Sequence, residues 1–263
     1  MVFELRFRRC VAVVCGLAAM LGCGDEGVVR PPAPGSVTLR FDHQVAGQPL
    51  RTYELRYTNA AGNLYSVSKL AYYVSDVRLR RGDGSEFVVG AVHYCNAESI
   101  STRDFALGDV PDGTYTALVF TFGLNEARNV TGGLPSSLWH DMAWPETWGG
   151  GYHYMQMEGR YADSTGSASI GYATHTGRRR LASDPAPYHH FFTVTLPLAP
   201  LVVQRDAWRI GLTMDIDEWY RGPHVYDLTA FGPNIMIDLY AQSLLMENGA
   251  DVFSMSGMSR LGP

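Results

Sequence analysis

The sequence predicts an all-β fold: an antiparallel β-sandwich with Greek-key-like connections and a short helix near the C-terminus. Apolar and polar residues alternate with a period of two in one segment after another, which is the pattern of strands buried on one face. Clusters of Gly, Pro, Asn and Asp separate these segments, as turns do. Apolar residues make up 46% of the 263-residue chain, so two sheets can bury their apolar faces against each other.

The predicted elements follow in order along the chain. Val, Leu, Phe, His and Val share one face of the first strand, 36–45, and the second, 53–57, alternates Tyr and Leu with Glu and Arg. A helix is predicted within 233–247, because Pro233 suits its first turn and an Asn-Gly pair suits its stop. The other predicted strands are 67–80, 115–123, 152–161, 168–176, 191–196 and 208–216, with turns at 59–62, 81–84, 111–113 and 164–166.

Residues 1–22 are predicted to be a signal peptide. Three arginines precede the apolar run 10–21, which is shorter than the roughly 20 residues that span a bilayer. The run ends in Met-Leu-Gly-Cys-Gly, which resembles the lipobox of bacterial lipoproteins. Cys23 is therefore expected to carry lipid and to anchor the protein to the outer membrane, in the periplasm or at the cell surface. A secreted protein without lipid is the alternative.

One domain is predicted after the signal peptide. Residues 23–35 are rich in Pro and Gly and are expected to form a flexible tether, followed by a single domain over 36–263. Loss of residues 1–22 removes three Arg and one Glu, so the formal charge changes from -5 to -7, and the basic footprint of a nucleic-acid binder is absent from the sequence. Cys95 is the one thiol of the domain and is expected to be a buried apolar residue without a disulfide.

His43 lies on the otherwise apolar face of the first predicted strand. A buried imidazole needs a hydrogen-bond partner or a metal ion, because an unpaired polar group is costly to bury. Two interpretations follow: His43 is bonded to a backbone carbonyl, or it is a metal ligand.

Two more histidines come from a predicted hairpin. A register centred on its polar turn places His153 opposite His175, with Cβ atoms about 5 Å apart, which suits two ligands of one metal ion. A slip of one residue would move one imidazole to the opposite face. Met155 and Met157 are expected on the face of His153, where soft thioethers would favour copper, although alternating methionines also suit a plain core.

The other polar groups form no recognised catalytic motif. His189 and His190 follow a Pro-rich loop and are expected at the surface. Asp215, Asp217 and Glu218 suit a strand end or a loop that faces a cation, without the ligand spacing of an EF-hand. The sequence contains no nucleophile elbow, HExxH or CxxC motif, so it indicates a protein that is not an enzyme.

Several motifs in a fixed order resemble one protein family over nearly the whole mature chain. The family is the MbnP-like family of bacterial periplasmic or lipid-anchored copper-binding proteins, which is related to the methanotroph surface protein MopE. The motifs are LRFDHQVAGQPL (39–50), GNLYSVSKLAYYVSDVRL (62–79), PDGTYTALVFTFGLN (111–125), MAWPETWGGGYHYMQMEG (142–159), GYATHTG (171–177) and NIMIDLYAQSLLMENGADVFS (234–254).

The resemblance implies a copper-binding function. In such proteins histidines and kynurenine hold the copper, and kynurenine is a tryptophan that a partner di-haem enzyme of the MauG or MbnH type has oxidised. Oxidation gives the donor-only indole an aromatic amine and a ketone. The candidate ligands in this chain are then His43, His153 and His175, and the candidate oxidised tryptophans are Trp144 and Trp148.

The chain departs from the family pattern around these tryptophans. It has Met-x-Trp-Pro where methanotroph members tend to have Trp-x-Trp. Two indole rings that simply cap the end of the sandwich are therefore the alternative to kynurenine. A structural or adhesive surface module without metal, in which the histidines are core groups, is the alternative to copper binding.

Overall fold

A computed structural model describes residues 34–163, 165–166, 169–181 and 183–262. The chain divides into two units, Met1–Pro32 and Ala33–Pro263, and all described residues belong to the second. The predicted signal peptide, the lipidated Cys23 and most of the predicted tether lie outside the described residues.

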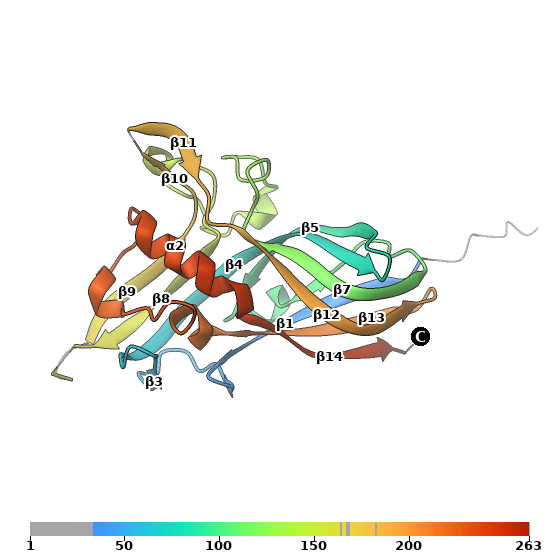
Figure 1. The fold of residues 1–263 in the computed structure, drawn as a ribbon, viewed down its shortest axis with the longest axis horizontal. Helices are drawn as coiled ribbons and strands as arrows, with labels where there is room; N and C mark the ends of the chain where they lie inside the picture. Colours follow the sequence, from blue (N-terminus) through green and yellow to red (C-terminus); the bar gives the residue numbers. More distant parts are fainter. Residues whose placement is uncertain (1–33, 164, 167–168, 182, 263) are drawn as a thin grey trace, which may run out of the picture. The chain divides into compact units, whose positions relative to one another are not determined.

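Strands dominate the described fold, and one helix of three turns lies near its end (Figure 1). The α-helices are α1 (Leu228–Phe231) and α2 (Leu239–Asn248), and the 3₁₀ helices are η1 (Ile100–Thr102), η2 (Ser136–Leu138), η3 (Glu146–Trp148), η4 (Ile216–Tyr220) and η5 (Gly249–Asp251). The strands are β1 (Ser36–Val45), β2 (Gln48–Pro49), β3 (Tyr57–Thr58), β4 (Leu64–Arg81), β5 (Glu86–Asn96), β6 (Asp104–Ala106), β7 (Gly113–Phe122), β8 (Met155–Ala162), β9 (Ser169–Thr176), β10 (Arg179–Leu181), β11 (Asp184–Tyr188), β12 (Phe192–Val203), β13 (Ala207–Asp215) and β14 (Phe253–Leu261).

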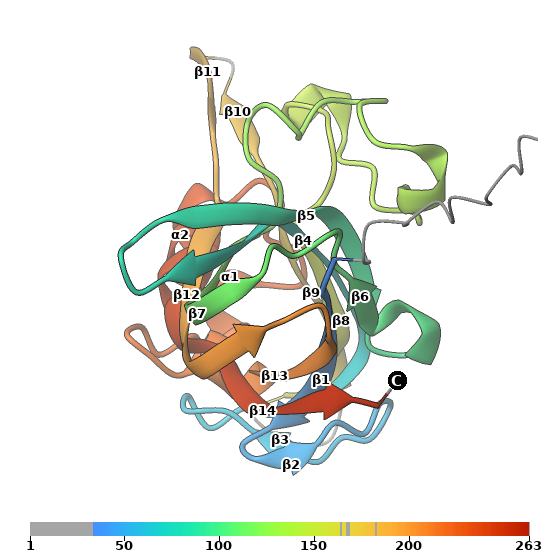
Figure 2. The same cartoon turned by 90° about the vertical axis from the view of Figure 1, so that its right-hand side faces the viewer.

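Two sheets face each other, and this confirms the predicted β-sandwich. The smaller sheet has the order β14-β13-β1-β2, with β6 also paired to β1. The larger has the order β12-β7-β4-β8-β9, with β3 and β5 also paired to β4. Figure 2 shows β1, β13 and β14 below and β5 above. The main core lies between the sheets, because apolar residues of β1 and β13 form one cluster with those of β4, β7 and β8.

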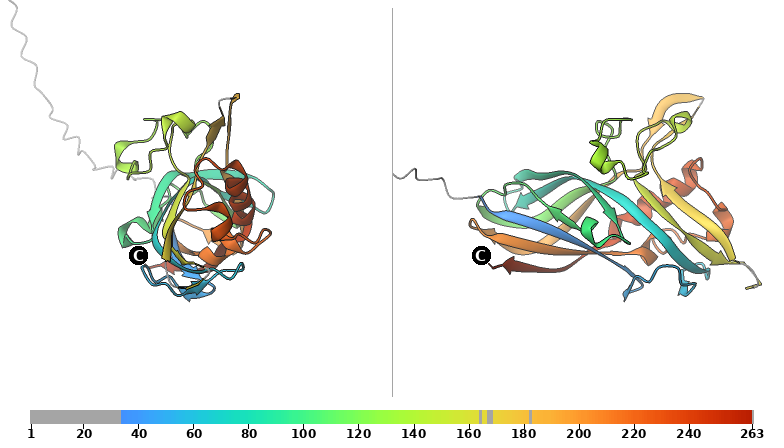
Figure 3. Two further views of the ribbon diagram at one scale, coloured as in Figure 1. Left: turned by 90° about the vertical axis from the view of Figure 1, so that its left-hand side faces the viewer. Right: turned by 180° about the vertical axis from the view of Figure 1, so that it is seen from behind.

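A second, smaller core covers the outer face of the larger sheet. The segment 123–154, between β7 and β8, lies over this sheet near the β10–β11 hairpin (Figures 1 and 3). Its buried residues form a cluster with side chains of β4 and β5 that excludes the main core; the members are Ala71, Tyr73, Tyr94, Leu124, Leu134, Met142, Tyr152 and Tyr154. The larger sheet is therefore buried on both faces at this end.

Pairing is antiparallel throughout the described strands except between β1 and β13, which run parallel from Ser36↔Ala207 to Gln44↔Asp215. The alternating pattern of each strand was visible in the sequence, but such a pattern carries no information on strand direction. A parallel pair needs a long connection, and here most of the chain lies between the two strands.

The predicted strand 53–57 is wrong. Tyr53 has a left-handed φ of 64° and is 70% exposed, and only Tyr57–Thr58 pairs, as β3. Its alternation reflects a surface loop, because two aromatic residues at this spacing do not by themselves require burial. The strands β2, β5, β6, β10, β11 and β14 were not predicted.

The C-terminal helix begins later than predicted. Asp238 caps α2 by accepting a hydrogen bond from the backbone N–H of Ala241 at 2.9 Å, so the helix starts after Asp238 rather than near Pro233. Its last residue is Asn248, followed by Gly249, as the predicted stop requires. Within the described ranges, we find no helix that is both long and apolar enough to cross a bilayer.

Candidate metal centre

The candidate site lies on the outer face of the larger sheet, the face that segment 123–154 covers. Ala71, Gln156 and His175 form one row across β4, β8 and β9, and their side chains share a face. The next row contains Tyr72 and Met155, which belong to the main core on the opposite face. Because Ala71 belongs to the second core, His175 lies on the outer side of the sheet.

His153 is held by the backbone of Met142. The Met142 carbonyl accepts from the N–H of His153 at 2.7 Å and lies 3.0 Å from its ring Nδ1. A carbonyl oxygen only accepts, so Nδ1 carries the proton and Nε2 has a lone pair. The side-chain amide nitrogen of Gln156 lies 3.3 Å from the same Nδ1 and donates a hydrogen bond to the carbonyl of Asp141 at 3.1 Å. Nε2 of His153 is buried and has no hydrogen-bond partner.

His175 is oriented by Glu158. Its Nε2 lies 3.0 Å from Oε1 of Glu158, two residues beyond Gln156 on β8. A carboxylate oxygen accepts, so Nε2 carries the proton and Nδ1 has the lone pair. Nδ1 of His175 is buried without a partner. Each of the two rings thus keeps one acceptor nitrogen that nothing in the described structure satisfies.

Burial keeps both imidazoles neutral. Burial, and then the neighbouring His175, lowers the pKa of His153 to about 3. Burial also lowers the pKa of His175, although the carboxylate of Glu158 acts in the opposite direction. The neutral imidazole is the form that binds a metal ion, so no proton must leave before binding near neutral pH.

The two rings are close enough to share one metal ion. Their centres are 5.0 Å apart and their planes are inclined by 86°. Two imidazoles that bind one tetrahedral ion through nitrogens at roughly 2.0 Å place their ring centres about 5 Å apart. The described residues contain no group of three His, Cys, Asp or Glu side chains that could hold a metal ion.

Trp144 is the aromatic ring next to this pair. Its side chain is buried, and its ring centre lies 4.7 Å from that of His153 in an edge-to-face arrangement. A Cβ on Gly177 would lie 2.6 Å from Cε3 of Trp144, so the indole packs directly on a backbone that carries no side chain. Its Nε1 donates to the carbonyl of Trp148 at 3.4 Å. An intact indole has no lone pair to offer a metal.

Trp148 belongs to η3 and is half-buried, with its ring centre 6.4 Å from that of Trp144. The three glycines 149–151 that follow all have left-handed φ angles of 125°, 65° and 82°. Residues with a Cβ adopt such angles at a cost, so these glycines allow the sharp bend that leads the chain back to His153.

His43 is not part of this pair. It contacts Tyr72, whose ring belongs to the main core on the other face of β4. Its Nε2 lies 3.0 Å from the Tyr72 hydroxyl and 4.0 Å from Sγ of Cys95, which is buried and free as predicted. Burial, and then Arg103 and Arg40, lowers the pKa of His43 to about 3. The structure therefore separates the three predicted ligands into one pair and one single residue.

The predicted hairpin register, with His153 opposite His175, is wrong by three residues. His175 pairs with Gln156, and His153 lies before β8 begins. The two imidazoles still meet, because the chain enters β8 irregularly through the bridge Ala143↔Tyr152. Met155 and Met157 do not share the face of His153, since both lie in the main core. Their thioethers are therefore core groups on the opposite side of the sheet.

One further expectation on polar residues needs correction. His190 is 4% exposed, and its Nδ1 lies 2.8 Å from the carbonyl of Gly177, so it is a buried residue and not a surface one. Asp215 is the last residue of β13, as the strand-end interpretation predicted. It accepts from the backbone N–H groups of Ala46 and Gly47 at 2.8 and 3.0 Å and so stabilises a turn.

Sequence reasoning missed Glu158 and the Met142 carbonyl, which fix the protonated nitrogen of each imidazole. Glu158 could have been identified with the correct register, because it lies two residues from Gln156 and therefore on the face of His175. The Met142 carbonyl could not have been identified, because a backbone acceptor leaves no trace in the sequence.

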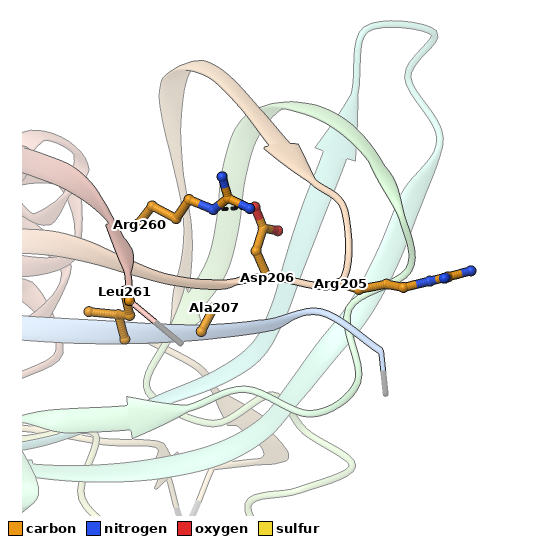
Figure 4. Close-up of a pocket in the computed structure, with 6 residues that line it drawn as sticks. Arg205, Asp206, Ala207, Arg260 and Leu261 are labelled. Atoms are coloured by element: carbon orange, nitrogen blue, oxygen red, sulfur yellow. Dashed lines mark ion pairs between the residues drawn. The ribbon is translucent and has the colours of Figure 1, made fainter. Parts of the chain in front are cut away.

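The other hollows offer less chemistry. One of about 580 Å³ lies where β13 begins and β14 ends (Figure 4). There Arg260 Nε is 2.9 Å from a carboxylate oxygen of Asp206, and Arg205, Ala207 and Leu261 line the rest. No His or Cys of the described chain lines this hollow, and the charged side chains of Arg260 and Asp206 form an ion pair with each other.

Comparisons with known proteins agree with the fold. The family model of MbnP matches residues 34–237 of the chain. Among solved structures, the fold is similar to that of MbnP from Methylosinus trichosporium, with a TM-score of 0.50 and 13% sequence identity, over 86% of this chain and 99% of that chain. No curated protein sequence matches the chain.

Proposed function

Because the chain belongs to the MbnP family, we propose that it binds copper through His153 and His175 and is not an enzyme. The observation that carries the proposal is the pair of unpartnered nitrogens, Nε2 of His153 and Nδ1 of His175. Buried acceptors normally find a partner, and a metal ion bound by both rings satisfies both at once. Imidazole nitrogens suit copper well.

The second part of the proposal concerns the missing donor. Two imidazoles rarely complete a metal site, and Trp144 is the ring beside them. Oxidative opening of its indole to kynurenine, in which water supplies the oxygen atoms, the oxidant accepts the electrons and the indole C2 leaves as formate, would replace a donor-only nitrogen with an aromatic amine and a ketone, both of which can bind a metal. Trp148, 6.4 Å from Trp144, is the second candidate for this oxidation.

The oxidation needs an external oxidant, and we assign this role to a partner di-haem enzyme of the MauG or MbnH type. Trp144 is only 2% exposed, so such a partner cannot touch its ring directly and would withdraw electrons from a distance. We further propose that a lipid on Cys23 anchors the protein to the outer membrane, in the periplasm or at the cell surface.

Copper titration of the metal-free mature protein tests the binding site. We expect one copper ion per chain in the native protein and none in a variant that combines His153→Gln and His175→Gln. His224→Gln is the matched control, because His224 lies half-exposed at the surface against Glu247. Unchanged stoichiometry in the double variant would contradict the assignment of these two ligands, whereas no copper binding by the native protein would leave a structural or adhesive module as the better function.

Peptide mass spectrometry of the protein from its native host tests the oxidation. We expect a mass change on the peptide that contains Trp144, and none when the di-haem partner is absent. An unmodified Trp144 and Trp148 in copper-loaded protein would contradict this part while leaving the histidine site intact.

A further inference from the structure

We propose that Glu158 and Lys69 form a positioning pair behind His175: Glu158 fixes Nδ1 as the donor atom, and Lys69 offsets the charge of Glu158 so that the carboxylate does not favour a divalent over a monovalent cation. The inference rests on the proposed function, because it concerns the same metal site. Neither residue contacts the two free nitrogens, so both would act through His175.

The contacts form one chain. Oε1 of Glu158 lies 3.0 Å from Nε2 of His175 and 3.6 Å from Nζ of Lys69. A metal-binding histidine commonly donates its other N–H to a carboxylate, which fixes the ring orientation and the donor nitrogen. Here the carboxylate is already in place, and the nitrogen that it leaves free is the one that lacks a partner.

A β-bulge places Lys69 beside Glu158. Val67 pairs with Gly159 and Lys69 pairs with Glu158, so two steps along β4 correspond to one step along β8. Without the extra residue, Ser68 would stand opposite Glu158 and Lys69 would face the main core. Bulges are common where a strand must re-aim a side chain. This one turns the single lysine of the sequence toward the outer face.

Stability does not explain the ion pair. The side chains of Lys69 and Glu158 are 33% and 37% exposed, and ion pairs at such exposure contribute little to folding. Glu158 also lines a hollow of about 510 Å³ together with Ser66, Ser68 and Gly159, so its carboxylate is open to solvent. His175, in contrast, has its free nitrogen buried. Lys69 and Glu158 therefore act on the buried ligand His175 from the surface of the protein.

Lys69 is linked to the metal ligands through Glu158. Its Nζ lies 3.6 Å from the carboxylate oxygen that is 3.0 Å from Nε2 of His175. A cation bound by His175 is attracted by Glu158 and repelled by Lys69, and each of these energies is twice as large for a divalent as for a monovalent ion. Glu158 alone would therefore favour a divalent ion, and Lys69 offsets this preference.

The experiment uses the mature protein with Ag(I) and Zn(II) as redox-inert probes, and nitrogen NMR of His175 in the metal-free state. For Glu158→Ala we expect loss of the Nε2–H form of His175 and a roughly 10- to 100-fold weaker affinity for both ions. For Glu158→Gln, whose amide oxygen still accepts, we expect the Nε2–H form to remain. This rescue separates positioning from a general loss of structure.

For Lys69→Met we expect the Nε2–H form to remain, and the affinity for Zn(II) to rise about two- to threefold relative to that for Ag(I). Equal changes for both ions would overturn the charge part, and an Nδ1–H form of His175 in the native protein would overturn the positioning part. Metal affinity unchanged in Glu158→Ala would contradict this inference alone. If neither ion binds the native protein at His153 and His175, the proposed function fails as well.

Discussion

Two groups of buried histidines lie on opposite faces of strand β4. On the inner face His43 is a single imidazole between Tyr72 and Cys95, whereas on the outer face His153 and His175 stand with ring centres 5.0 Å apart. All three have pKa values lowered by burial, and all three have one unpartnered nitrogen. Burial and a free nitrogen therefore do not by themselves distinguish a metal ligand from a core residue.

The difference lies in what surrounds each ring. The protonated nitrogens of His153 and His175 are each fixed by an acceptor, and the two rings face a common neighbourhood with Trp144. The ring of His43 instead contacts the hydroxyl of Tyr72 and the thiol of Cys95 within the main core. We conclude that a second imidazole and a fixed donor atom are the features that mark the outer pair as the candidate site.

The largest effect is expected from a substitution that disturbs the sheet between the two groups of histidines. In Gly159→Val the new Cβ would lie 1.9 Å from the backbone oxygen of Ser66, and neither strand can yield. We expect a loss of more than about 4 kcal/mol in unfolding free energy, measured by denaturant titration. Gly171→Ala on the neighbouring strand is the control, because its nearest atom would be 4.0 Å away. Similar stability of the two variants would contradict the packing described here.

The outer group alone is disturbed by Gly177→Ala. The methyl group would lie 2.6 Å from the ring of Trp144, so the indole must move. We expect a cost of about 1–3 kcal/mol in unfolding free energy, a changed tryptophan fluorescence and weaker copper binding. Normal copper binding with displaced fluorescence would show that Trp144 is not needed at the site.

The inner group alone is disturbed by His43→Gln. The variant removes a buried hydrogen bond to Tyr72, which typically costs about 1–3 kcal/mol when the partner is left unsatisfied. Copper affinity should stay within twofold of the native value. Stability is read from denaturant titration and affinity from competition with a chelator. Full stability of the variant would contradict the role of His43 in the core.

The smallest effect is a pH dependence that His43 adds to stability. Its pKa is about 3 in the folded state against 6.5 as the ordinary value, so above pH 6.5 both states are neutral and no proton is linked to unfolding. Below pH 6.5 the unfolded state binds the proton and is favoured, by up to about 1.4 kcal/mol for each pH unit down to about pH 3. The metal-free His43→Gln variant should show a correspondingly shallower loss of stability between pH 6 and pH 4. An unchanged slope would mean that His43 is not held neutral.

The fold class followed from the sequence because alternation reports burial strand by strand. The strand β1 was predicted with its bounds, and the burial of His43 came with it. Strand 53–57 was mistaken because Tyr53 and Leu55 lie on an exposed loop and only Tyr57 is buried. The parallel pairing of β1 with β13 was missed because direction depends on the connection and leaves no local pattern.

The sequence placed His153 and His175 together, but not in the geometry that the structure has. They were chosen from a hairpin register that is off by three residues, and they meet because the glycines 149–151 bend the chain before β8. His43 was grouped with them because an apolar strand face does not say which of two cores it enters. The face of each residue is decided by sheet order and by irregular entry into strands, which are tertiary features.

The central claim is most directly tested by the copper affinity of two single variants of the metal-free mature protein, His175→Gln and His43→Gln, measured by chelator competition at neutral pH. The account predicts that His175→Gln binds copper about 100-fold more weakly or not at all, while His43→Gln binds within twofold of the native protein. The reverse order, with strong binding by His175→Gln and loss in His43→Gln, would contradict the assignment of the outer pair as the metal site.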